Sequence, residues 1–227
     1  MLEGLTSLLL LGVLAAGGSE LPAFSREAPR CEVDTPHCFG IDLHIVVEDD
    51  KPVQTSRWFA RQISEANRLF ASIDTTFELR SVEAVEAESA EIDTRLERDL
   101  LGRKRFTRGV IHVFVVRRLA DVDIAGEEIR GVHWRDRGDT TRRWIILSSI
   151  GESRVLAHEL GHFFGLRHSR YAVSIMNKTP RSSPPWKERR FAPEEVERMR
   201  AHMRRMLRTG ALLHRPRPDR GLRISGG

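Results

Sequence analysis

The segment from His158 to His168 constrains this chain more than any other, because it has the form H-E-x-x-H-x-x-G-x-x-H. On a helix, His158 and His162 are four residues apart and share one face, so both imidazoles can reach one metal ion. Gly165 can adopt a left-handed backbone conformation, which would end the helix and bring His168 round as a third ligand. Three neutral nitrogens leave the fourth position of a tetrahedral zinc ion open for water, which is typical of a catalytic site.

Glu159 follows the first of these histidines and can reach a water molecule on the metal. The sequence therefore predicts that bound zinc lowers the pKa of its water toward about 7 and that Glu159 acts as general base. Two other interpretations remain, a buried helix with three structural histidines and no metal, and a zinc site that does not catalyse. Burying three imidazoles and a carboxylate without a metal would be costly, and the presence of Glu159 argues against the second alternative.

The pattern resembles the metzincin clan of zinc endopeptidases. Met176, eight residues after His168, fits the Met-containing turn of that clan, and this short spacing together with Ser169 resembles the matrixin branch. The resemblance is specific over residues 154–177. It implies an α+β fold, a metzincin-like zincin catalytic domain with a twisted mixed β-sheet, an active-site helix and a C-terminal helix. It also implies that Met176 forms an apolar floor beneath the metal without binding it.

The composition is that of a globular protein, and 227 residues suffice for one domain with a full core. The formal net charge is +5, but Lys and Arg are interleaved with Asp and Glu until the C-terminal tail. No nucleic-acid recognition motif accompanies this charge, so we expect no nucleic-acid partner. We expect a monomer that acts on a protein or peptide substrate.

Residues 1–18 resemble a secretory signal peptide. The apolar run at 8–16 has signal-peptide length and is too short to span a bilayer, and residues 16–18 supply small side chains for cleavage. Glu3 and the lack of Lys or Arg before the run argue against this interpretation, and the alternative is an N-terminal core helix. We therefore expect a secreted or periplasmic protein with no stable membrane anchor.

Residues 19–40 are predicted to form a linker or short pro-segment, which holds the two cysteines of the chain, Cys31 and Cys38. In an exported chain we expect a disulfide that closes this short loop. Residues 29–31, Pro-Arg-Cys, also resemble the matrixin propeptide switch, in which the thiolate binds the catalytic zinc, although Glu32 stands where that family has Gly. Mutation of Cys31 separates the two, because a switch predicts raised activity and a disulfide predicts lost stability.

We assign residues 41–210 to the catalytic domain, and apolar periodicity predicts the order of its elements. Strands are expected at 41–47, 76–82, 110–116 and 144–149, and helices at 55–71 and 83–104. The continuous apolar run at 110–116 indicates a strand buried on both faces, with His112 as a core histidine and not a ligand.

The helix that carries the metal motif is predicted to be capped by Ser153. The last helix is expected to begin at Pro193, to end before Gly210 and to bury one stripe of side chains, namely Val196, Met199, Met203 and Met206. Residues 211–227 are rich in Arg, Pro and Gly and are predicted to form a disordered basic tail.

Residues 119–143 show the least regular pattern. Their carboxylates could hold Ca²⁺, as loops of some matrixins do, but the ligand spacing is not ordered and we favour a solvated loop; the candidates are Asp121, Asp123, Glu127 and Glu128. An edge strand is expected at Gly131, Val132, His133 and Trp134, where a substrate peptide would add as a further strand. The alternative is an ordinary hairpin. Lys178 follows the Met turn and, at the rim of the cleft, would favour acidic substrate residues.

The favoured function is a secreted zinc-dependent endopeptidase. The first alternative is a peptide-binding protein that has a zinc site but no turnover, and the second is a zinc hydrolase of narrow specificity. Turnover separates the first alternative from an enzyme, and peptides with free and blocked termini separate endo- from exo-cleavage.

Overall fold

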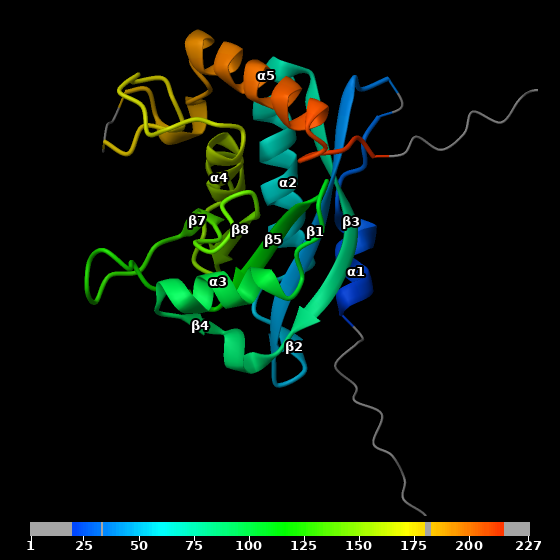
Figure 1. Cartoon of the computed structure of the whole chain (residues 1–227), viewed down its shortest axis with the longest axis vertical. Helices are drawn as coiled ribbons and strands as arrows, with labels where there is room; N and C mark the ends of the chain where they lie inside the picture. Colours follow the sequence, from blue (N-terminus) through cyan, green and yellow to red (C-terminus); the bar gives the residue numbers. More distant parts are fainter. Residues whose placement is uncertain (1–19, 33, 180–182, 216–227) are drawn as a thin grey trace, which may run out of the picture.

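The computed structural model describes residues 20–32, 34–179 and 183–215 and has an α+β architecture (Figure 1). The elements in chain order are α1 (Leu21–Glu27), β1 (His37–Glu48), β2 (Lys51–Pro52), α2 (Ser56–Phe70), β3 (Thr75–Val85), β4 (Glu91–Ile92), α3 (Arg95–Arg103), β5 (Ile111–Val116), β6 (Arg118–Leu119), β7 (Gly131–Arg135), β8 (Arg143–Ser148), α4 (Val155–Phe163) and α5 (Pro193–Arg208). Single 3₁₀ turns lie at Ala71–Ile73, Ala87–Ser89 and Trp186–Glu188.

A mixed sheet forms the centre of the molecule. Its strand order is β2-β1-β5-β8-β7, with β3 paired to β1 as well, and β4 and β6 form a separate small sheet. Strands β3, β1, β5 and β8 are parallel, whereas β7 is antiparallel to β8 and lies at the edge. This is the mixed sheet that the resemblance implies, and β7, at its edge, forms a hairpin with β8.

Each face of the sheet has its own hydrophobic core, because successive strand residues point to opposite faces. Val113 and Val115 of β5 pack in a large core with apolar side chains of α1, α2, α4 and α5, whereas Phe114 and Val116 pack in a smaller core with Leu101 of α3. All six residues of β5 are buried. The prediction of a strand buried on both faces is therefore confirmed.

Local sequence explains the two longest helices. The hydroxyl of Thr55 accepts the backbone N–H of Trp58 at 3.2 Å and caps the start of α2. Pro193 occupies the first turn of α5, followed by two acidic residues that favour the positive end of a helix. Met199, Met203 and Met206 are buried on the inner side of α5, as predicted.

His112 lies in the core, as expected for its place in the buried strand. Its Nδ1 is 3.1 Å from His44 Nε2, and its Nε2 is 2.9 Å from the backbone nitrogen of Thr107. Burial lowers the pKa of His112, so the ring is neutral at physiological pH. His112 is not among the described residues that gather as possible metal ligands.

Two predictions about helices are wrong. The single helix expected at 83–104 is instead the end of β3, a 3₁₀ turn, β4 and α3. Helix α3 begins only at Arg95 because Thr94 and Glu97 form a reciprocal capping box. Ser153 does not cap the motif helix, whose N-cap is Arg154 without a side-chain cap.

The segment expected to be a linker or pro-segment is folded where the structure describes it. It contains α1 and the start of β1, so Cys38 lies in a strand. Phe24 of α1 is buried against Phe59 of α2, with ring centroids 6.5 Å apart. Apolar side chains in a short helix thus find a core that their local sequence does not indicate.

The beginning of the predicted disordered tail is also packed. Leu212 is buried, and the backbone N–H of Arg215 donates to the carbonyl of Cys38 at 2.8 Å. The rest of that tail, residues 216–227, and the predicted signal peptide, residues 1–18, lie outside the described residues.

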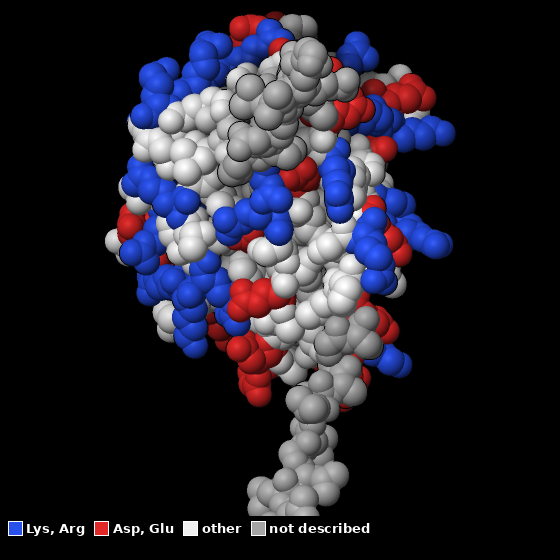
Figure 2. Space-filling view, turned by 90° about the vertical axis from the view of Figure 1, so that its right-hand side faces the viewer, with Lys and Arg blue, Asp and Glu red and all other residues white. Residues whose placement is uncertain are grey.

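Charge is well mixed on the side of the molecule that carries α1 and β3, where Figure 2 shows basic and acidic side chains interleaved around a band of uncharged surface. In the described part of the chain, no helix is long and apolar enough to cross a membrane.

Candidate metal centre and cleft

The turn after α4 brings the three histidines of the motif together. Gly165 has φ +91°, and the N–H of Leu166 donates to the carbonyl of Gly161 at 2.9 Å, as in a Schellman cap. Nitrogens of all three rings, His158, His162 and His168, lie within 4.8 Å of one another. A left-handed glycine after the helix therefore produces the convergence that the spacing predicts.

Backbone carbonyls orient two of these rings. His158 Nδ1 lies 2.9 Å from the carbonyl oxygen of Ile175, and His162 Nδ1 lies 2.9 Å from that of Leu166. A carbonyl oxygen only accepts, so each Nδ1 carries the proton and each Nε2 offers its lone pair. His162 Nε2 is 3.2 Å from His168 Nε2, so these two nitrogens are close enough to bind one metal ion.

The protonation state of the group suits a metal. Burial lowers the pKa of His158 to about 3 and that of His168 to about 4, and burial also lowers the pKa of His162. The rings are therefore neutral at physiological pH, and neutral imidazole is the form that binds metal ions. Three such nitrogens could hold a metal ion, and this ligand set suits zinc.

The Met turn packs directly beneath α4. Met176 is fully buried, and a Cβ added at Gly161 would lie only 2.6 Å from its sulfur. Met176 N–H donates to the Ser174 hydroxyl oxygen at 2.9 Å, and that hydroxyl donates to the buried carboxylate of Glu195 on α5. Helix α5 thus anchors the turn, and the absence of a side chain at Gly161 lets the turn approach the metal helix.

Glu159 belongs to α4, and its side chain reaches the edge strand β7. Its Oε2 accepts the backbone N–H of His133 in β7 at 2.7 Å. The side chain is buried, and burial raises the pKa of its carboxyl to about 7. A carboxyl group with a pKa near neutrality is well suited to accept and return a proton at physiological pH.

Strand β7 presents an open edge to this site. Hydrogen bonds from Ser148 N–H to the Arg130 carbonyl and from Asp136 N–H to the Arg142 carbonyl join it to β8. Because antiparallel pairing alternates, the backbone groups of Gly131, His133 and Arg135 face away from β8.

A cleft of about 980 Å³ runs along β7. It is lined by all three histidines, by Glu159 and by Lys178, which the sequence placed at the rim. Trp186 lines it as well.

Arg154 is a positioning residue that sequence reasoning missed. Its guanidinium is buried, bonds Glu65 of α2 at 2.9 Å and donates to backbone carbonyls of Trp186 and Lys187. It thereby fixes the segment that carries Trp186 against the start of the metal helix. The partners lie 89 and about thirty residues away along the chain, so no local spacing could have indicated the role.

The acidic loop does not gather into a calcium site. Asp123 pairs with Arg95, and Asp121 accepts the N–H groups of Asp123 and Ile124. Glu128 lies 3.9 Å from Arg118. Among the described residues, the possible metal clusters are the three histidines and a group at the cysteines, so the calcium interpretation gains no support.

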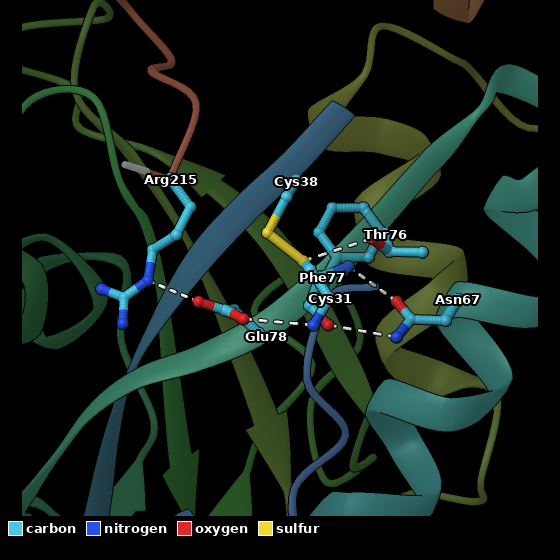
Figure 3. The surroundings of a disulfide bond; sticks show 7 residues. All are labelled: Cys31, Cys38, Asn67, Thr76, Phe77, Glu78 and Arg215. Atoms are coloured by element: carbon cyan, nitrogen blue, oxygen red, sulfur yellow. Dashed lines mark hydrogen bonds and ion pairs between the residues drawn. A yellow bond between two sulfur atoms is a disulfide. The ribbon is translucent and has the colours of Figure 1, made fainter. Parts of the chain in front are cut away.

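The cysteine group is a disulfide. Cys31 and Cys38 are bonded to each other, as predicted, and Figure 3 shows the bond against β3. Glu78 accepts the backbone N–H of Cys31 at 3.1 Å and pairs with Arg215, so it joins the segment before β1 to the C-terminal end of the described chain. Cys31 is not part of the histidine cluster, and the structure thus shows the disulfide and not the thiolate switch.

The family model of matrixin peptidases matches residues 63–198 of the 227. The chain belongs to the matrixin family. The matched region contains the histidine motif, the Met turn and the edge strand, so the family assignment rests on the same residues as the geometry.

A solved metalloproteinase shares the fold of this matrixin. The crystal structure of metalloproteinase-II from Bacteroides fragilis matches with a TM-score of 0.50 and 12% identity, over 76% of this chain and 55% of that one. The chain thus spans about half the length of that protein. Archaemetzincin from Methanopyrus kandleri matches with a TM-score of 0.49 and 14% identity, over 76% and 99% of the two chains. No curated protein sequence matches. The family assignment and the shared fold agree with the clustering of the three histidines.

Proposed function

We propose that this matrixin is an exported zinc endopeptidase in which His158, His162 and His168 hold the metal and Glu159 is the general base. The observation that carries the proposal is the position of Glu159. Its carboxyl lies in the cleft on the helix of the first two histidines and also contacts the strand on which a peptide would lie. One side chain thus lies between the metal ligands and the expected position of the scissile bond.

The roles of the residues follow from these positions. Bound zinc would polarise the scissile carbonyl and make its water acidic. Glu159 takes the proton from the attacking water and gives it to the departing amine, which its pKa near 7 permits at physiological pH. The open backbone groups of β7 hold the peptide extended by strand addition. A peptide held this way need not end near the site, which supports internal cleavage.

Export is supported by the disulfide, because such bonds persist in oxidising compartments. The predicted signal peptide at 1–18 agrees with this proposal, and we expect the protein to act as a monomer. Calcium is not required by any feature of the described residues.

The decisive experiment measures zinc content and cleavage of quenched peptides with blocked termini by the wild type and by Glu159→Gln. The variant should keep its zinc and lose about 10²- to 10⁴-fold in kcat, the usual contribution of a general base. Glu152→Gln is the matched control, because Glu152 is exposed, pairs with Arg130 and precedes the helix. It should cleave normally.

Loss of a ligand, as in His162→Ala, should abolish both zinc binding and cleavage. Equal cleavage by Glu159→Gln and the wild type would refute the assigned role. Zinc binding with no turnover on any peptide would instead favour the alternative of a peptide-binding protein. Cleavage restricted to peptides with a free terminus would replace endopeptidase by exopeptidase.

A further inference from the structure

A second hollow, of about 420 Å³, adjoins the catalytic cleft and has an unusual charge. The two cavities share Arg135 and His202, so they meet at the end of β7. The hollow is also lined by Arg108, Arg143 and Arg205, and none of the described residues that line it is Asp or Glu. Positive charge is thus collected in a concave site beside the metal centre.

Two of these arginines oppose each other directly across strands. Arg135 of β7 is the register partner of Arg143 of β8. The neighbouring pair, Asp136 and Arg142, makes the ladder hydrogen bond, so the arginine pair is of the kind whose side chains lie closest together. Like charges directly opposite in a sheet are destabilising, and the fold nevertheless retains them here.

Arg143 is the most enclosed of these cations. It is half-buried, with its guanidinium carbon 5.1 Å from the centre of the Phe163 ring and Nη1 3.3 Å from the Phe163 carbonyl. Burial, together with the nearby charges of Arg135 and Arg205, lowers the pKa of Arg143 to about 10. An anion placed among the three guanidinium groups would remove this repulsion.

These cations have no carboxylate partner in the described part of the chain. Arginines close to them in sequence do, because Arg137 pairs with Asp99 and Arg142 pairs with Asp139. No ion pair is found for Arg135, Arg143 or Arg205 among the described residues. What distinguishes Arg135, Arg143 and Arg205 from other arginines is that they line one hollow together, without an acidic residue among its described lining.

A buried ring nitrogen faces the same positive field. His133 Nε2 is buried and has no hydrogen-bond partner among the described residues. Burial lowers the pKa of His133 well below its usual value, with further lowering by Arg135, Arg143 and His202. The ring is therefore neutral and does not balance the positive charge of the arginines, so an anionic ligand could balance it.

We propose that this cationic hollow is a subsite for a carboxylate of the peptide substrate, with Arg143 and Arg205 as its principal contacts. The substrate preference rests on the proposed peptidase function, whereas carboxylate binding does not. Planar guanidinium groups recognise carboxylates through paired hydrogen bonds, and desolvation strengthens such contacts.

The position along the peptide follows from β7. His133, whose N–H meets the catalytic glutamate, and Arg135, which lines the hollow, are two residues apart, or roughly 7 Å of extended chain. A peptide paired with β7 would therefore place an acidic side chain in the hollow two or three residues from the scissile bond. A chain that ends there could offer its terminal carboxylate instead.

The first test compares quenched peptides that differ only by Glu or Gln, with that residue moved through each position on both sides of the scissile bond. At one position kcat/KM should favour Glu about tenfold, the usual value of one hydrogen bond to a charged group. Arg143→Gln and Arg205→Gln should each remove this preference, so that the variant cleaves the Glu and Gln peptides with equal kcat/KM.

The controls separate this subsite from other cations. Arg204 is exposed on α5 and does not line the hollow, so Arg204→Gln should keep the preference. Lys178→Gln tests the rim lysine, and loss of the preference in that variant alone would overturn the proposal.

Arg143→Gln should also unfold at an equal or higher temperature than the wild type, because repulsion is removed, whereas a merely structural Arg143 predicts a lower one.

A binding assay keeps the outcome independent of turnover. Fluorescence anisotropy with Glu159→Gln protein should show about tenfold tighter binding of the Glu peptide than of the Gln peptide, dependent on Arg143. An amidated peptide with internal Glu and a peptide that ends at that position distinguish a side-chain from a terminal carboxylate.

The outcomes separate the two proposals. Selective binding of Glu peptides without cleavage of any peptide by the wild type would keep the subsite and refute the peptidase. Cleavage of Glu and Gln peptides at equal rates at every position would keep the peptidase and overturn the subsite. Tighter binding of an oligonucleotide than of the Glu peptide would also overturn it.

Discussion

Replacement of Arg154 by Met tests whether a buried ion pair holds the cleft wall to the metal helix. The side chain of Arg154 is 6% exposed and that of its partner Glu65 is 29% exposed. Removing one partner of a buried pair costs about 3–5 kcal/mol. We expect Arg154→Met to lower the free energy of unfolding by about 3 kcal/mol, the lower end of this range, because Glu65 remains partly in contact with solvent. The carbonyls of Trp186 and Lys187 also lose their hydrogen-bond donor.

Arg68 supplies the matched control, because it bonds the same oxygen of Glu65 at 2.9 Å but is 51% exposed. Exposed pairs of this kind contribute about 0.5 kcal/mol or less, so Arg68→Met should hardly change the free energy of unfolding. Arg154→Lys should fall between the two, since an ammonium can reach Glu65 but cannot also span the carbonyls. Urea unfolding of each variant gives the free energy of unfolding.

Equal losses of stability for Arg154→Met and Arg68→Met would refute this reasoning. So would unchanged peptide cleavage at full zinc loading, because release of the segment that carries Trp186 should raise KM. A loss of stability with unchanged KM would leave Arg154 as a purely structural residue.

Two further predictions concern stability. The hydrogen bonds of Arg103 hold the pKa of Asp136 at about 2. The pair therefore stabilises the fold above the normal Asp pKa of about 4, and this contribution is lost as pH falls toward 2. Asp136→Asn should make the thermal unfolding temperature depend less on pH in this range, and an unchanged dependence would count against the assignment. Replacing Cys31 and Cys38 together by Ser should lower the free energy of unfolding, measured with urea, by about 2–3 kcal/mol, as expected for two cysteines seven positions apart. Raised peptidase activity in this variant would instead restore the thiolate-switch interpretation.

The parts of this protein that the sequence predicted depend on short-range spacing. The convergence of His158, His162 and His168 requires only one helical turn and a glycine, and it is found where the motif placed it. The burial of β5 and the methionine stripe of α5 follow from apolar periodicity, which is likewise local. Pairing of Cys31 with Cys38 needs only a short loop. Each signal lies within about ten residues.

Local patterns also misled where the core decided the outcome. Charge and scattered leucines at 83–104 suggest one helix, but the chain continues β3 in pairing with β1 as far as Val85. Residues 19–40 are predicted to be a linker or short pro-segment, and their polar composition does not indicate that Phe24 packs against Phe59 of α2. Leu212 is drawn from the predicted tail into a bridge with Gly109. Burial of apolar side chains against distant parts of the chain therefore helps to order short segments that their own sequence does not specify.

Tertiary structure alone decided the surroundings of the metal motif. The contact of Glu159 with His133 spans 26 residues and that of Arg154 with Glu65 spans 89, so neither leaves a periodic trace. The cationic hollow depends on the register of β7 against β8, and a slip of one residue would turn Arg135 to the other face. The sequence therefore determined which residues can bind a metal, whereas strand register and helix packing determined what a peptide meets beside it.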